Sequence, residues 1–100
     1  MYLLHGKVTS KKGYADEVAN ILLQASRIVS TVRGCRLYVV SKDQRDLNTV
    51  YVTAIWENKE DHDKSLKLKG IKELMLRVMP ILAEQPTKGQ ELETLGGLGI

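Results

Sequence analysis

Residues 48–56 alternate as a β-strand requires, yet they carry apolar side chains on both sides. Successive side chains of a strand point to opposite faces. One face would therefore hold Val50, Val52, Ala54 and Trp56, and the other Tyr51, Thr53, Ile55 and Glu57. A strand with one face in water normally keeps that face polar. We therefore expect both faces to be covered, one by the chain's own helices and the other by a second copy of the chain or a ligand.

Two further strands and one long helix precede this stretch. Residues 2–9 and 35–41 alternate in the same way, and the polar residues 42–48 would connect the second of these strands to the next as an antiparallel hairpin. Acidic Asp16 and Glu17 suit a helix start near Tyr14, and Gly34 suits the position just past a helix end. The helix is predicted from apolar residues at steps of three and four: Val18, Ile21, Leu22, Ala25, Ile28 or Val29, and Val32.

The second half of the chain predicts a broken helix and a last strand. Asn58 is a candidate N-cap for a helix that runs to about Leu68, and Gly70 is expected to break it. Pro80 should end or kink the next helical piece near Val78. Residues 90–95 are predicted as an exposed edge strand, followed by a flexible tail at 96–100. The apolar stripe of the second piece is Ile71, Leu74, Met75, Val78, Ile81 and Leu82.

The resulting order, β-α-β-β-α-β, predicts an α+β ferredoxin-like fold with a four-stranded antiparallel sheet. A chain of 100 residues with 43% hydrophobic and 27% charged residues suits one globular domain, which we place at residues 1–95. The net charge of +3 is explained by solvated lysines, and the strands lack the glycine- and aromatic-rich signature of RNA readers. No apolar run is long enough to span a membrane, and no signal peptide is recognisable. With Cys35 as the single cysteine, a reducing cytoplasmic setting is expected.

Few residues offer chemistry. Two histidines and one cysteine make no cluster at metal-ligand spacing, and nucleotide, flavin and hydrolase motifs are missing, so we expect no cofactor and no metal. Trp56 is either a core anchor or the wall of a ligand cavity. Tyr38 and Tyr51 lie on neighbouring strands and would fill a dimer interface or line a pocket. His5 is a sheet histidine or a proton shuttle, and His62, between two aspartates, is an exposed helix residue or a base.

Several segments together resemble the antibiotic biosynthesis monooxygenase family, the small dimeric α+β barrels that include quinol monooxygenases. They are KKGYADEV, GCRLYVV, the strand ending in IWENKED, the later MPIL and the C-terminal strand. The resemblance implies a homodimer whose sheets pack face to face, and a cavity between each sheet and its helices. Some members oxygenate quinols or polyphenols there without metal or flavin, because the electron-rich substrate itself reduces molecular oxygen.

The chain departs from the family pattern at two positions. Many relatives have an acidic residue where this chain has Ala54 and a histidine where it has Ser65. His62 lies one turn before Ser65 on roughly the same helix face and would replace the missing base. Haem-degrading relatives need an asparagine and a helix histidine, but this chain has Gly6 and residues 72–75 there, which disfavours haem degradation.

We therefore predict a cofactor-independent monooxygenase for a small aromatic quinol or polyphenol. The predicted catalytic residues are His62 and His5, and the predicted substrate-binding residues are Trp56, Tyr51 and Tyr38. The alternative is a non-catalytic dimer of the same fold that binds or senses a small aromatic ligand. Only the enzyme would consume oxygen.

Overall fold

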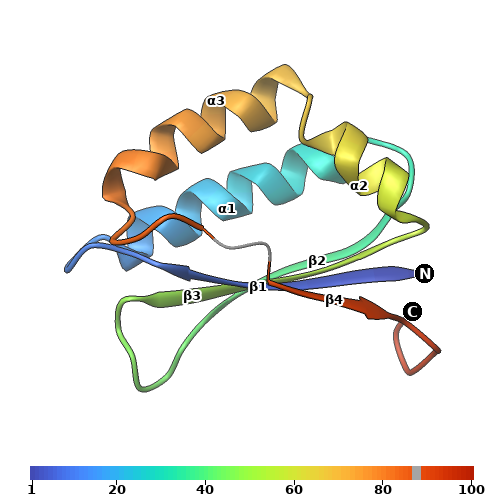
Figure 1. Ribbon diagram of the computed structural model, residues 1–100, viewed down its shortest axis with the longest axis horizontal. Coiled ribbons are helices and arrows are strands. Elements are labelled where there is room, and N and C mark those ends of the chain that lie inside the picture. The colour runs from blue at the N-terminus through green and yellow to red at the C-terminus, as the bar shows by residue number, and fades with distance from the viewer. Residues whose placement is uncertain (87–88) are drawn as a thin grey trace.

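The computed structural model describes residues 1–86 and 89–100 and shows an α+β ferredoxin-like fold, as predicted. Four antiparallel strands form one sheet in the order β2-β3-β1-β4, and the helices lie together on one side of it (Figure 1). No helix in this described part is long and apolar enough to cross a membrane. The strands are β1 (Tyr2–Thr9), β2 (Cys35–Lys42), β3 (Thr49–Trp56) and β4 (Gln90–Glu93); the helices are α1 (Ala15–Val29), α2 (Lys59–Ser65), α3 (Lys69–Val78) and the short 3₁₀ turn η1 (Met79–Ile81).

The central strands have the register that places the two predicted faces of β3 on opposite sides of the sheet. Tyr2 of β1 pairs with Trp56, and Gly6 pairs with Val52. We call the side that faces the helices the inner face and the opposite side the outer face. The core cluster contains inner-face Val50, Ala54 and Trp56. Outer-face side chains come from all four strands: Leu3, His5, Lys7, Leu37, Val39, Ser41, Tyr51, Thr53, Ile55, Gln90 and Leu92.

The first helix packs as its apolar stripe predicts, but it ends earlier than expected. Val18 and Ile21 of α1 are 0% and 1% exposed. The helix ends at Val29, so Val32 lies outside it and Gly34 is not directly past its end. Gly34 instead has a φ of 98° in the turn into β2, where any side chain would also collide with Asp61. The positive φ explains why glycine is needed there.

The bounds of α2 and α3 correct another predicted helix end. Asn58 is the N-cap of α2 as predicted, since its side-chain oxygen accepts a hydrogen bond from the backbone N–H of Asp61 at 2.8 Å. Gly70 does not break the helix; it lies in the first turn of α3, and the break falls at residues 66–68. The backbone of Leu68 is extended, which separates the two helices. The break before Pro80 at Val78 is confirmed, with Pro80 inside the 3₁₀ turn.

Candidate functional site

Three rings from three different elements meet on the inner face, where α2 crosses the end of the sheet. The ring of His62 in α2 lies 5.6 Å from the ring of Tyr2 in β1 and 5.8 Å from the ring of Trp56 in β3. Tyr2 and Trp56 are brought together because they pair directly across the two strands. We call Tyr2, Trp56 and His62 the aromatic cluster. It combines an imidazole with apolar ring surface, the combination that suits proton transfer from a phenol.

The tautomer of His62 follows from its hydrogen-bond partner. Its Nδ1 lies 3.1 Å from Oδ1 of Asp63, and its side chain is only 12% exposed. An ionised carboxylate only accepts hydrogen bonds, so Nδ1 carries the hydrogen of the neutral imidazole. The lone pair is then on Nε2, which is the atom able to accept a proton. A carboxylate that fixes a histidine in this way also stabilises the imidazolium that proton transfer creates.

The indole of Trp56 is closed in the core and has an unused donor. The residue is 1% exposed, and its Nε1 is buried without a hydrogen-bond partner among the described residues. A buried N–H without an acceptor costs about 1–3 kcal/mol, so such groups usually have a structural or functional reason. An oxygen atom of a bound ligand is the kind of acceptor that this N–H lacks.

Tyr2 is held in its protonated form by its surroundings. Burial and the hydrogen bond that its hydroxyl donates to Oε2 of Glu91, at 2.9 Å, raise the pKa of Tyr2 to about 12. The same carboxylate lies 3.8 Å from Nζ of Lys59 in α2, so Glu91 joins β4 to both β1 and α2. At neutral pH Tyr2 is therefore a hydrogen-bond donor and a ring surface.

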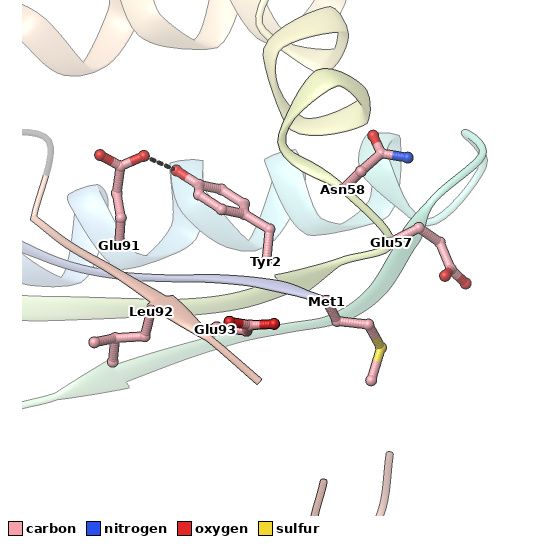
Figure 2. A pocket seen from close by; sticks show the side chains of 7 residues that line it. All are labelled: Met1, Tyr2, Glu57, Asn58, Glu91, Leu92 and Glu93. Carbon is pink, nitrogen blue, oxygen red and sulfur yellow. Dashed lines mark hydrogen bonds between the residues drawn. The ribbon is translucent and has the colours of Figure 1, made fainter. Parts of the chain in front are cut away.

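An open hollow of about 370 Å³ lies at the same end of the sheet. In Figure 2 the side chains of Tyr2 and Glu91 lie on the helix side of the sheet, joined by their hydrogen bond. The side chain of Leu92 lies on the opposite side of β4. Tyr2 belongs to both the hollow and the aromatic cluster, whereas Trp56 and His62 do not line the hollow. Its lining residues are Met1, Tyr2, Glu57, Asn58, Glu91, Leu92 and Glu93.

The inner face also has open space at Gly6, two inner-face positions beyond Tyr2 along β1. Gly6 lies on this face, because it is an even number of residues away from inner-face Tyr2 and Val8 on the same strand. It is paired with Val52 of β3. A Cβ built on Gly6 would meet no described atom within 4 Å. The neighbouring inner-face positions hold Leu4 and Val8 on β1 and Val52 on β3, with the small side chain of Ala54 opposite Leu4.

The structure divides the five predicted site residues between the two faces. Trp56 and His62 meet in the aromatic cluster. Tyr38 is also on the inner face, opposite Ala54, and burial raises its pKa to about 12. His5 and Tyr51 lie on the outer face, where their rings stack at 5.5 Å with an interplanar angle of 11°. A single cavity between sheet and helices therefore does not contain all five residues.

On the outer face, His5 contacts two side chains of β3. Nδ1 of His5 lies 2.9 Å from the hydroxyl of Thr53, its partner in the register. Tyr51 is one outer-face position along β3 from Thr53 and stacks on the imidazole. Tyr38 and Tyr51 are on neighbouring strands as predicted, but they point to opposite faces of the sheet and do not line one pocket.

Sequence reasoning missed Tyr2, Glu91 and Gly6. Tyr2 and Glu91 are 89 residues apart and meet because β4 pairs with the start of β1. The signal available in the sequence was the predicted edge strand itself, since a fold of this topology places its last strand beside its first. The glycine was recognisable as an unfavourable residue in the middle of a strand.

The two positions that depart from the family pattern are both buried. Ala54 is 3% exposed and Ser65 is 5% exposed. The hydroxyl of Ser65 donates a 2.6 Å hydrogen bond to the backbone carbonyl of His62, so it is already used within α2. Within residues 1–86 and 89–100, no three His, Cys, Asp or Glu side chains are grouped to hold a metal ion.

Comparison with known proteins assigns the family. The sequence model described as antibiotic biosynthesis monooxygenase matches residues 1–75. This chain belongs to the antibiotic biosynthesis monooxygenase family. A solved structure from Chloroflexus aurantiacus J-10-fl, provisionally named an antibiotic biosynthesis monooxygenase, has a TM-score of 0.88 and 30% identity over 99% of this chain and 97% of its own. No curated protein matches the sequence.

More distant members of the family share the fold alone. A structure from Deinococcus radiodurans with the same provisional name is 20% identical, with a TM-score of 0.81 over 100% of this chain and 98% of its own. One from Nitrosomonas europaea is 11% identical, with a TM-score of 0.88 over 94% and 89%. Family membership and the 30% identical structure from Chloroflexus aurantiacus support a monooxygenase-type function.

Proposed function

We propose that this protein is a cofactor-independent monooxygenase that oxidises a small aromatic quinol or polyphenol on the inner face of its sheet. The observation that carries the proposal is the aromatic cluster, in which His62 contacts both Tyr2 and Trp56. A phenol needs a base to become an electron-rich phenolate, and the cluster supplies one beside apolar ring surface. In the proposed reaction one oxygen atom of O₂ enters the ring and the other leaves as water, and all the electrons come from the substrate.

The proposed roles follow from the positions of the groups. Nε2 of His62 accepts the proton of the substrate hydroxyl, while Asp63 stabilises the resulting imidazolium. The indole N–H of Trp56 donates a hydrogen bond to a substrate oxygen and so gains the partner that it lacks. Tyr2 and Tyr38, each with a pKa of about 12, stay protonated and provide ring surface. Exclusion of water by α2 would strengthen these interactions.

We further propose that two copies pack through their outer faces. Figure 1 shows the helices on one side of the sheet only, so no described helix covers the other side. Val39 and Leu92 are 43% and 49% exposed there. A second copy would bury these apolar side chains together with the stacked rings of His5 and Tyr51. In this arrangement His5 and Tyr51 belong to the interface rather than to the proton-transfer site.

The single cysteine is consistent with a reducing, cytoplasmic setting. Burial raises the pKa of Cys35, and its Sγ lies 3.7 Å from the carbonyl oxygen of Leu37. A thiol held in its neutral form is a poor nucleophile and oxidises slowly. We therefore propose that Cys35 has a packing role and takes no part in the reaction.

Oxygen uptake by the purified, metal-free protein tests the proposed function. Quinols and catechols are supplied, their autoxidation is subtracted, and His62→Gln is compared with His5→Gln. Glutamine keeps hydrogen-bonding capacity but accepts no proton at neutral pH. We expect saturable uptake that falls about 100-fold in His62→Gln, the usual scale of general-base loss, and is retained in His5→Gln.

Other outcomes would change the proposal in defined ways. Loss of uptake in His5→Gln alone would move the proton acceptor to the outer face. Binding of the same compounds by the wild-type protein without any oxygen uptake would contradict the enzyme and favour a ligand-binding or sensor module.

A further inference from the structure

We propose that the exposed side of α3 docks the protein on an anionic lipid surface. In this arrangement Leu76 enters the lipid, and the lysines beside it contact the phosphates of the headgroups. This surface is separate from the proposed reaction site, because it is the side of α3 that faces away from the core.

The outermost residue of α3 is a leucine. The residues that α3 buries in the core are Ile71, Leu74 and Val78. Leu76 lies two residues from both Leu74 and Val78, and a helix turns by about 100° per residue, so its side chain points away from the core. Leu76 is 75% exposed. A single exposed leucine is common on protein surfaces, so its neighbours decide what it indicates.

The neighbours of Leu76 on this side of α3 are two lysines, one methionine and one glutamate. Residues three, four or seven apart on a helix share a face, which places Lys69, Lys72 and Met79 in one row with Leu76. Glu73 lies beside this row. Both lysines are exposed, and Met79 is 43% exposed. We call Lys69, Lys72, Leu76 and Met79 the outer stripe; α3, which carries it, runs along the top edge of the molecule in Figure 1.

Positive charge is concentrated in α3 and just before it. Residues 64–79 contain five basic residues and one acidic residue, whereas the rest of the chain contains ten basic and eleven acidic residues. This short segment therefore accounts for the net charge of +3. Within residues 1–86 and 89–100, its four lysines form no ion pair, so their ammonium groups can bind an external anion. The basic residues are Lys64, Lys67, Lys69, Lys72 and Arg77.

Lysines beside exposed aliphatic side chains match an anionic lipid surface. Binding to such a surface gains from buried apolar area and from the attraction between basic residues and anionic headgroups. Leu66, which is 50% exposed just before α3, adds another aliphatic side chain to the same segment. Single-stranded nucleic acids bind to aromatic rings on which bases stack, and the outer stripe has none. A second copy of the chain would bring the same lysines face to face, which is unfavourable.

Sedimentation with lipid vesicles tests the inference on the whole chain. One set of vesicles is phosphatidylcholine alone, and the other is an equal mixture of phosphatidylcholine and phosphatidylglycerol. We expect binding to the mixed vesicles only, and weaker binding as salt rises, because exposed charges are screened. Lys69→Gln together with Lys72→Gln should weaken binding about 30-fold, from about 5-fold for each lysine. Leu76→Ser should weaken it about 10-fold and keep the salt dependence.

The matched control removes the same two charges elsewhere. Lys12→Gln together with Arg45→Gln changes two exposed residues near the loop between β2 and β3, and should leave binding nearly unchanged. Equal binding to both kinds of vesicle, or an equal loss in the control pair, would overturn the proposal. So would full binding by Leu76→Ser. Binding to single-stranded nucleic acid without binding to vesicles would identify a different partner and contradict the lipid surface.

Discussion

The inner and outer faces of the sheet are built from the same strands and differ chiefly in what covers them. On β3, Trp56 is 1% exposed and packs in the core beneath the helices. On the outer face of neighbouring β2, Val39 is 43% exposed. Ile55 on the outer face is only 5% exposed, and it lies between Leu3 and Leu37 of the adjacent strands.

The difference shows that apolar character alone does not identify a functional face. The inner face combines its core with a histidine, an unpartnered indole N–H and an unfilled position at Gly6. The outer face combines apolar side chains with one stacked pair, His5 and Tyr51. The proposed chemistry belongs to the first face and the proposed association to the second, and each proposal has a direct test.

The largest expected effect comes from truncating the core anchor. Trp56→Ala removes a fully buried ring and should lower the free energy of unfolding by about 3–5 kcal/mol. Val39→Ala, on the exposed side, should cost under about 1 kcal/mol at protein concentrations where the chain is monomeric. Urea unfolding of both variants measures the difference. Equal losses would mean that the two faces are equally buried in the isolated chain.

A charge on the outer face should break the proposed dimer. Val39→Lys would bring two cations into an apolar interface, and like charges there cost several kcal/mol. We expect the dimer dissociation constant to rise by roughly 30-fold or more, measured by sedimentation at several concentrations. Leu76→Lys adds the same charge at a residue of α3 that is 75% exposed, and it should leave association unchanged. A wild-type protein that stays monomeric at all concentrations would contradict the dimer.

The smallest expected effect is a loss of stability at high pH caused by Tyr38 on the inner face. Burial raises its pKa from 10.0 to about 12, so between these pH values the unfolded chain loses the proton while the folded chain keeps it. The free energy of unfolding should therefore fall by about 2 kcal/mol as pH rises through this window, and show no such contribution below pH 10. Comparing the urea unfolding of Tyr38→Phe with that of the wild type isolates the contribution of Tyr38 to this pH dependence, because lysine deprotonation is common to both proteins. Parallel pH curves would show that Tyr38 is not buried.

The local errors of sequence reading have physical reasons. Gly70 was expected to end a helix, but a glycine tolerates helical geometry and here lies beside Ile28 of α1, where a Cβ would come within 2.9 Å of the Ile28 side chain. The helices α1 and α3 therefore pack closely at Gly70, a residue whose low helix propensity had suggested a helix end. Likewise, the turn at residues 30–33 ends α1 before Gly34, although Val32 continues the apolar stripe and still packs against the core.

The sequence by itself determined the order of strands and helices, the two faces of β3 and the fold class, because side-chain period depends only on neighbours along the chain. It also singled out Trp56 and His62. Only the tertiary structure decided that His5 and Tyr51 lie on the face away from them, and that Tyr2 joins the cluster and is held there by Glu91. Those facts depend on strand pairing between residues as far apart as 2 and 91, and on which side of the sheet the helices pack. Alternation along the chain defines two faces, but it does not say which one the helices will cover.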